Sequence, residues 1–134
     1  MGDVIILRGA PGAGKSSLAR LFQLLNGPAT AVVSADAYVF ADGNQWSPER
    51  LQEGHSRCWA QFILHLKNKV PVIIVDNTNQ LVRDYERYWT FAEMQGYNVR
   101  HIVVENRHQG QNAHNCPPEV VERARRRIMS DLML

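Results

Sequence analysis

Four short apolar stretches divide the chain, and each has the length and composition of a buried β-strand. They are Val4–Leu7, Ala31–Ser34, Pro71–Val75 and Val99–Val104. Stretches that are apolar at nearly every position, rather than at alternate ones, are typical of strands covered on both faces of a parallel sheet. The stretch Pro71–Val75 is uniformly apolar, so we expect it near the centre of the sheet.

Between these strands, apolar residues recur at steps of three and four, a spacing that predicts helices. Capping serine, first-turn proline and terminal glycine residues mark where the helices begin and end. The expected helices run from about Lys15 to Gly27-Pro28, from Ser47-Pro48-Glu49 onward, from about Val82 to Gln95 before Gly96, and from Pro117-Pro118-Glu119 onward.

The helical spacing also predicts which side chains face the core. In the first helix the apolar residues at this spacing are Leu18, Leu21, Phe22 and Leu25. The second has the stripe Leu51, His55, Cys58, Trp59, Phe62 and Leu66, and the third is expected to bury Tyr85, Trp89 and Ala92. We interpret the aromatic members as core residues rather than ligand-stacking groups.

The alternation of strands and helices predicts an α/β fold with a three-layer parallel sheet and right-handed crossovers. At 134 residues, the length suits a single domain spanning 1–134. In such folds ligands bind beyond the carboxyl ends of the strands. Polar residues follow all four strands, so we expect a site at that rim.

The segment after the first strand matches the phosphate-binding pattern G-x-x-x-x-G-K-S/T at every fixed position. It consists of Gly9, Ala10, Pro11, Gly12, Ala13, Gly14, Lys15 and Ser16, with Ser17 following. Glycines let backbone N–H groups approach phosphate oxygens, and the helix begins with its positive end at the same anion. Lys15 is suited to the β- and γ-phosphates, and the Ser16 hydroxyl to Mg²⁺. The pattern predicts binding of ATP with Mg²⁺.

Composition narrows the class of protein only a little. A net charge of +2 permits a nucleic-acid partner without requiring one. Two cysteines are too few for a disulfide framework, and the longest apolar run, Val70–Val75, is too short to span a bilayer. We therefore expect no membrane association and a cytoplasmic location.

Two acidic residues follow strands and suggest the chemistry. Asp36 follows a strand that we expect beside the phosphate-loop strand, and its carboxylate is a candidate general base for an incoming hydroxyl. Its alternatives are a helix cap or a water-mediated Mg²⁺ contact. Asp76 ends an apolar strand, where phosphate-loop proteins place a second magnesium-binding acid.

Thr78 and Asn79 follow Asp76 and offer hydroxyl and amide groups for a substrate phosphate or base edge. Local turn hydrogen bonds are an equally good explanation of both residues. The polar segment 105–116 is expected to act as a lid that excludes water. Arg107 in that lid and Arg123 on the last helix are candidates for stabilising the transferring phosphoryl group. The alternative for the arginines of that helix is a solvated face with Glu119–Arg123 and Glu122–Arg126 pairs at i,i+4.

Several motifs occur in one order along the chain: the loop Gly9–Ser17, Ser34–Tyr38, Trp46–Pro48 with His55, Val75–Asn79, and Asn112–Pro117. Together they resemble the kinase domain of phage polynucleotide kinase and its compact AAA-type P-loop kinase relatives. The resemblance covers nearly the whole chain and implies a nucleoside or polynucleotide kinase-like topology.

The resemblance implies ATP- and Mg²⁺-dependent phosphorylation of a hydroxyl, typically the 5′-OH of DNA or RNA, with DNA the more favoured. It implies Asp36 as general base, with Thr78 and Asn79 near the acceptor strand. The chain departs from the family at Gln111, where relatives usually carry a lid arginine, and at Val39, where the phage enzyme has a substrate-contacting arginine.

These departures keep other acceptors open. Similar phage kinases phosphorylate a hydroxymethyl group on a modified pyrimidine, such as 5-hydroxymethyluracil, which must be presented out of the base stack. Kinases of free nucleotides or small metabolites share the architecture, and a module that binds ATP without transferring phosphate is a further alternative.

Overall fold

A computed structural model describes residues 2–105 and 116–132. Its strands are β1 (Asp3–Arg8), β2 (Thr30–Val33), β3 (Val72–Asp76) and β4 (Asn98–Val103). Its α-helices are α1 (Lys15–Asn26), α2 (Ala35–Val39), α3 (Pro48–Lys67), α4 (Val82–Met94) and α5 (Pro118–Leu132). Two short 3-10 helices, η1 (Gly27–Ala29) and η2 (Ala41–Gly43), complete the order.

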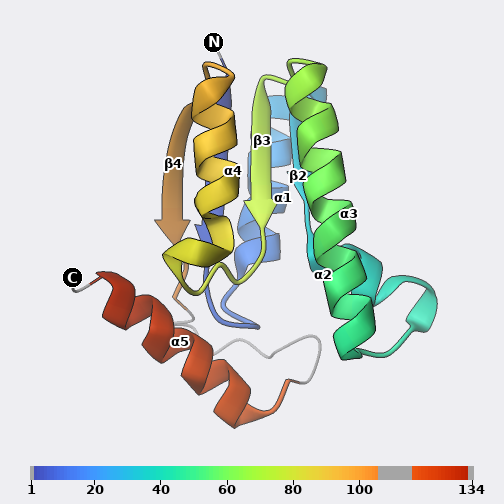
Figure 1. Cartoon of the computed structure of the whole chain (residues 1–134), viewed down its shortest axis with the longest axis vertical. Helices are drawn as coiled ribbons and strands as arrows, with labels where there is room; N and C mark the ends of the chain where they lie inside the picture. The colour runs from blue at the N-terminus through green and yellow to red at the C-terminus, as the bar shows by residue number, and fades with distance from the viewer. Residues whose placement is uncertain (1, 106–115, 133–134) are drawn as a thin grey trace.

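The strands form one parallel sheet in the order β2-β3-β1-β4. Helices cover both faces, with α3 and α4 on one side and α1 on the other (Figure 1). The α/β fold and the three-layer parallel sheet predicted from the sequence are therefore confirmed. The central place of β3 is also confirmed, since it pairs with β1 and β2.

One expectation about the sheet was wrong. The strand before Asp36, β2, does not lie beside β1, because β3 is inserted between them. The physical reason is burial: β3 is almost wholly buried, so the interior position satisfies both its backbone edges and both its faces. Helix α1 connects β1 to β2 across the intervening strand, contacting both β2 and β3.

The core on the α3 and α4 side contains an aromatic cluster. Phe62 and Tyr88 are fully buried with ring centroids 4.8 Å apart, and Trp59 meets the Tyr88 ring edge-on at 5.0 Å. Burying side chains of this size stabilises the fold by about 1.5–3 kcal/mol each. The aromatic residues of α3 are thus core residues, as expected.

Helix α4 differs slightly from the prediction. Tyr85 and Ala92 are buried as expected, but Tyr88 is buried while Trp89 is only half-buried. Tyr88 faces the rings of α3, whereas Trp89 lies against His101 of β4 at 6.0 Å. The middle residue of the buried stripe is therefore one position earlier than the spacing predicted, and its two ends are as predicted.

The helix ends agree with the capping signals. Ser47 accepts a hydrogen bond from the Arg50 backbone N–H at the start of α3, and Gly27 and Gly96 follow α1 and α4 with positive φ. In α1, Leu18 and Phe22 pack against the core, while Leu21 and Leu25 are exposed. The short helix α2 was not predicted, because five residues are too few for a periodic signal.

Helix α5 lies beyond the carboxyl ends of the strands (Figure 1). Arg8, the last residue of β1, is fully buried and its Nη2 donates to the Asp131 carboxylate of α5 at 2.7 Å. This ion pair ties α5 to the strand that enters the phosphate loop. Within residues 2–105 and 116–132, no helix is both long and apolar enough to cross a membrane.

Candidate active site

The phosphate loop occupies the turn between β1 and α1. Gly12 and Gly14 have φ values of 82° and 106°, a left-handed region in which a side chain is strained. The Ala13 N–H donates to the Ala10 carbonyl at 3.0 Å and tightens the turn. Helix α1 begins with no side-chain cap and no acidic residue in its first turn, so its N-terminal end favours an external anion.

Gly9 is required by close packing rather than by its φ angle. A Cβ at this position would lie 2.8 Å from the Val104 carbonyl oxygen. The Gly9 N–H donates to the Thr78 carbonyl at 3.1 Å. The start of the loop is therefore held between the ends of β3 and β4, at the rim where polar residues were expected.

The Lys15 side chain curls into the loop. Its Nζ donates to the carbonyls of Gly9 at 2.8 Å and Ala10 at 3.1 Å, and only 9% of the residue is exposed. Burial lowers the pKa of Lys15, and the negative charges of Asp76 and Asp36 partly offset that effect. Both carboxylates thus act on the ammonium group that is suited to the phosphates.

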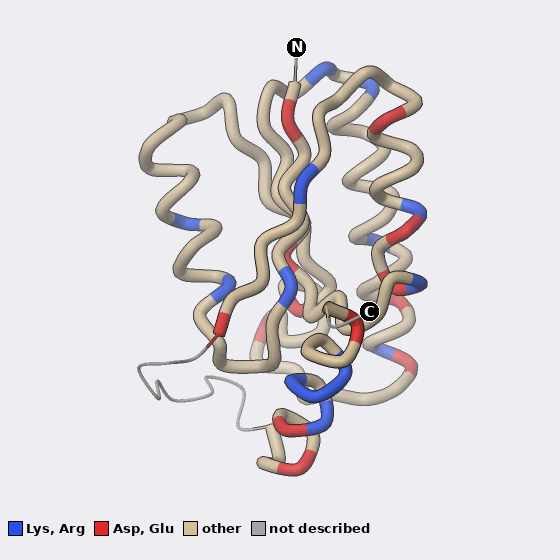
Figure 2. Tube along the Cα trace, turned by 90° about the vertical axis from the view of Figure 1, so that its left-hand side faces the viewer, with Lys and Arg blue, Asp and Glu red and all other residues tan. Residues whose placement is uncertain are grey.

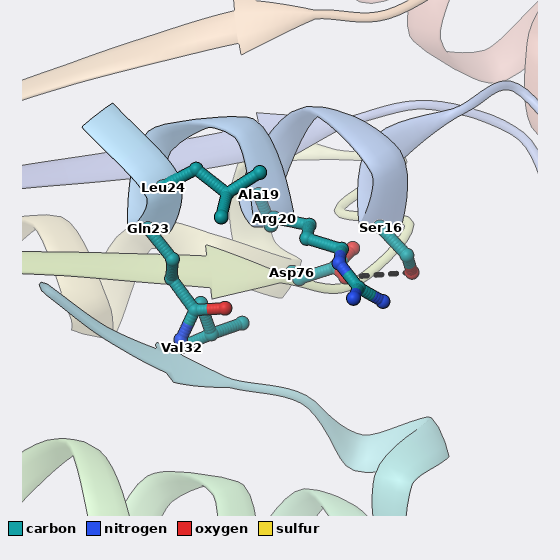
Figure 3. A pocket seen from close by; sticks show the side chains of 7 residues that line it. All are labelled: Ser16, Ala19, Arg20, Gln23, Leu24, Val32 and Asp76. Carbon is teal, nitrogen blue, oxygen red and sulfur yellow. Dashed lines mark hydrogen bonds between the residues drawn. The ribbon is translucent and has the colours of Figure 1, made fainter. Parts of the chain in front are cut away.

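Ser16 and Asp76 meet at the first turn of α1. The Ser16 hydroxyl donates to Asp76 Oδ2 at 2.9 Å. Figure 3 shows this contact at one end of an open pocket of about 410 Å³. The pocket is lined by Ser16, Ala19, Arg20, Gln23, Leu24, Val32 and Asp76.

The oxygen atoms of Ser16 and Asp76 are of the type that a magnesium ion prefers, and they would suit one held together with nucleotide phosphates. Mg²⁺ prefers oxygen ligands and is commonly held by one or two carboxylates together with substrate phosphates. No cluster of three or more His, Cys, Asp or Glu residues suited to a metal occurs among the described residues. Burial raises the pKa of Asp76, against the hydrogen bond from Ser16 and the charge of Lys15.

Asp36 is exposed on α2, near the donor side of the site. Its charge acts on the pKa of Lys15, Asp76 and His55, which lie on three different elements. Burial lowers the pKa of His55, and the Asp36 carboxylate opposes that shift. The structure therefore brings Asp36 to the same end of the sheet as the phosphate loop, although β2 and β1 are not adjacent.

Sequence reasoning missed two residues that hold α2 in place. Asn77 Oδ1 accepts a hydrogen bond from the Ala35 N–H at 2.9 Å, and Asn77 is buried. In α3, a Cβ on Gly54 would lie 2.7 Å from the Ala35 carbonyl oxygen. An isolated glycine within a helical pattern, and a polar residue directly after a buried strand, were the available signals.

The positions following Asp36 differ from the family pattern. Val39, where the phage enzyme has an arginine, is fully buried. Its carbonyl accepts a hydrogen bond from Arg50 Nε at 3.0 Å. Arg50 and Arg57 of α3 lie over the Tyr38 ring, with their Cζ atoms 4.8 and 4.4 Å from its centroid. Guanidinium groups are thus present beside α2, but they come from α3.

Thr78 and Asn79 are tied to the neighbouring strand. The Asn79 side-chain amide donates to the Leu7 carbonyl at 2.7 Å and the Asn77 carbonyl at 3.2 Å, and only 3% of Asn79 is exposed. Thr78 is half-buried. The contacts of Asn79 agree with the local hydrogen-bonding explanation, and Thr78 has the more accessible side chain of the two.

Of the two arginine candidates, only Arg123 belongs to the described residues. Arg107, Gln111 and all of the expected lid except Glu105 and Cys116 lie outside the described residues. Arg123 is exposed on α5 and lines a groove with Leu81, Arg126 and Arg127. No phosphate-loop residue lines that groove.

Comparison with protein families gives a match over almost the whole chain. A family model described as an AAA domain matches residues 4–129. The chain is 33% identical over 97 residues to NEDD4-binding protein 2 from Homo sapiens, covering 72% of this chain and 5% of that protein. It is 31% identical over 102 residues to 2′,3′-cyclic-nucleotide 3′-phosphodiesterase from Mus musculus, covering 76% of this chain and 23% of that protein.

Solved structures share the fold. The RNA repair complex of Pnkp1, Rnl and Hen1 includes a chain that superposes with a TM-score of 0.72 at 22% identity, over 98% of this chain and 45% of that one. The APS kinase CysC of Mycobacterium tuberculosis superposes with a TM-score of 0.58 at 19% identity, over 99% and 98% of the two chains. The expected likeness to P-loop kinases is confirmed at the level of the fold.

Proposed function

The chain belongs to the AAA domain family, and from that premise we propose that it is an ATP-dependent kinase that transfers the γ-phosphate to a hydroxyl of a nucleic acid. The single observation that supports the proposal is the hydrogen bond from the Ala35 N–H to Asn77 Oδ1 at 2.9 Å, which joins the residue before Asp36 to the residue after Asp76. The charge of Asp36 also acts on the pKa of Lys15 and of Asp76, the donor-side groups.

The donor side uses the phosphate loop. Backbone N–H groups of Gly9–Ser17 and the N-terminal end of α1 would bind the phosphates of ATP, and the Lys15 ammonium would exchange its loop carbonyls for phosphate oxygens. Ser16 and Asp76 would hold Mg²⁺, which neutralises developing charge on the phosphates. Positioning and charge neutralisation account for most of the catalysis of phosphoryl transfer.

The acceptor side uses Asp36 as general base. The acceptor oxygen forms a bond to the γ-phosphorus, the bond from that phosphorus to the bridging oxygen breaks, and ADP leaves. The acceptor proton passes to the Asp36 carboxylate. In this proposal Arg107 and Arg123 are the candidates for stabilising the phosphoryl group, and Thr78 is a candidate contact to the acceptor. Asn79 supports the loop that carries Thr78.

A nucleic-acid acceptor is supported by the order of motifs and by the RNA repair complex among the structural neighbours. We propose a polynucleotide 5′-hydroxyl as the first acceptor to examine, in DNA or RNA. The alternative acceptor is the hydroxymethyl group of a modified pyrimidine in DNA. It is supported by Val39, which is buried and stands where the phage enzyme has a substrate-contacting arginine.

A second candidate function, phosphorylation of a small metabolite, is supported by the likeness to an APS kinase over nearly its full length. A module that binds ATP without transferring its phosphate is a further alternative, and Gln111 is the feature of this sequence that favours it.

One assay separates these functions. Purified protein is incubated with ATP labelled on its γ-phosphate, Mg²⁺ and one acceptor at a time: 5′-OH DNA, 5′-OH RNA, DNA containing 5-hydroxymethyluracil, free nucleotides, or adenylyl sulfate. Labelling of a nucleic acid that is lost in the Asp36→Asn variant supports the proposal. Labelling of small molecules alone contradicts its nucleic-acid part, and ATP binding without transfer to any acceptor contradicts it entirely.

A further inference from the structure

A groove along α5 concentrates positive charge. It is an open hollow of about 660 Å³ between α5 and the residue that precedes α4. Its lining residues are Leu81, Arg123, Arg126, Arg127, Ser130 and Asp131. Figure 2 shows the basic residues of the last helix gathered in its middle part, with acidic residues toward both ends.

The charge of this groove is mostly uncompensated. Its one acid, Asp131, is already paired with Arg8, whose Nη2 donates to it at 2.7 Å. Arg126 has a single longer contact with Glu122, at 3.4 Å. Among the described residues, no carboxylate lies within 4.0 Å of Arg123 or Arg127.

Arg125, on the same helix, differs from the groove arginines because it is paired closely with Glu122. Arg125 donates to both carboxylate oxygens of Glu122, at 3.0 and 2.6 Å, and does not line the groove. Helical spacing puts Arg123, Arg126 and Arg127 on the side of the helix that lines the groove. Arg125 has the closer, two-point contact with Glu122, whereas Arg126 has one contact with it at 3.4 Å.

The groove is fixed relative to the phosphate loop. Arg127 Nη1 donates to the Gln80 side-chain oxygen at 3.2 Å. The backbone carbonyls of Gln80 and Asn79 accept from Arg8, at 3.0 and 2.9 Å. Because Arg8 directly precedes Gly9, these contacts join the wall of the groove to the strand that enters the phosphate loop.

From this arrangement we propose that the groove binds the sugar–phosphate backbone of a single nucleic-acid strand, on the 3′ side of the hydroxyl that is phosphorylated. This inference rests on the proposed function, in which the 5′-hydroxyl of the bound strand is the phosphate acceptor. Guanidinium groups bind phosphate oxygens through paired donors, and Leu81 supplies an apolar surface for a sugar or base. Backbone contacts of this kind position a strand without selecting a sequence.

The test compares Arg126→Gln/Arg127→Gln with the matched control Arg125→Gln, which removes a charge from the same helix outside the groove. Binding of fluorescent 12-nucleotide 5′-OH DNA and RNA is measured by anisotropy across a salt series. The double variant should bind about tenfold or more weakly, with a salt slope smaller by about one to two. Arg125→Gln should stay close to the unmodified protein.

A second variant avoids removing an arginine that contacts Gln80. Ser130→Glu places a negative charge in the groove, and it should weaken oligonucleotide binding while ATP affinity stays unchanged. For each variant, thermal unfolding identifies any loss of folding. The DNA and RNA arms show which backbone is bound more tightly.

The outcomes distinguish this inference from the proposed function. Equal binding by the double variant and Arg125→Gln overturns the groove assignment, even if phosphate is transferred. The absence of oligonucleotide binding by the unmodified protein also overturns it. Polyglutamate of similar length serves as an anion without a sugar–phosphate backbone, and the assignment is overturned as well if the double variant loses affinity for polyglutamate and for the oligonucleotide equally. Weakened oligonucleotide binding in the double variant, without phosphorylation of any acceptor, supports the groove and contradicts the kinase.

Discussion

The side-chain oxygen of Asn77 accepts a hydrogen bond from the Ala35 N–H at 2.9 Å, and this contact joins the end of β3 to the first turn of α2. The residue before Asn77 is Asp76 and the residue after Ala35 is Asp36. This hydrogen bond therefore links the segment of the candidate magnesium ligand directly to the segment of the candidate base.

Asn77→Ala should lower turnover more than nucleotide affinity. The variant leaves the Ala35 N–H without its acceptor, which costs about 1–3 kcal/mol of unfolding free energy, and α2 loses its anchor. Urea unfolding and kcat for the best acceptor provide the two measurements. Asn98→Ala, at an exposed residue of β4, is the control. Unchanged kcat in Asn77→Ala would show that α2 is held by other contacts.

Gly54→Ala should disturb the same helix from the α3 side. The new Cβ would lie 2.7 Å from the Ala35 carbonyl oxygen, and such overpacking costs about 1–3 kcal/mol. The better helix propensity of alanine returns at most about 1 kcal/mol. Thermal unfolding and kcat are compared with Ser56→Ala, an exposed position of the same helix. A stabilised and fully active Gly54→Ala protein would contradict the close packing.

Asp36→Asn should keep ATP binding and lose turnover by about a hundredfold or more, because the amide cannot take the acceptor proton. Calorimetric titration with a non-hydrolysable ATP analogue measures binding, and label transfer measures turnover. Asp42→Asn is the matched control, since Asp42 is exposed in the nearby η2 segment. Equal turnover in both variants would remove Asp36 from the mechanism.

Lys15→Met should weaken binding of ATP by about tenfold to a hundredfold, the value of a hydrogen bond from a charged donor. AMP affinity should change much less, because the ammonium is assigned to the β- and γ-phosphates. Lys67→Met, at the exposed end of α3, serves as the control. Parallel losses for ATP and AMP would place Lys15 elsewhere on the nucleotide.

Asp131→Asn should destabilise the fold by about 3 kcal/mol, because it leaves the fully buried Arg8 without its carboxylate. Asp3→Asn breaks the exposed Arg100–Asp3 pair, at 3.7 Å, and should cost under about 1 kcal/mol. Denaturant unfolding gives both values. Hydrogen exchange of the α5 backbone should also become faster in Asp131→Asn. If Asp131→Asn and Asp3→Asn lower the free energy of unfolding equally, the Arg8–Asp131 ion pair does not hold α5.

The secondary structure was largely predictable because it depends on local patterns. Uniformly apolar stretches located the strands, and Ser47, Gly27 and Gly96 located helix ends, since caps act within a few residues. The phosphate loop was identified from spacing alone. Helix α2 was not, because five residues give no periodic signal and its contacts with Asn77 and Gly54 come from distant parts of the chain.

The sequence by itself determined the chemical groups of the site: a loop for phosphates, an ammonium at Lys15, and carboxylates at the ends of two strands. Only the tertiary structure decided which of them meet. It inserted β3 between β1 and β2, turned the Asn79 amide toward the backbone of β1, and paired Asp131 with Arg8 so that the arginines of α5 line a groove. These outcomes depend on burial and long-range pairing, which act between residues far apart in sequence and leave no local pattern.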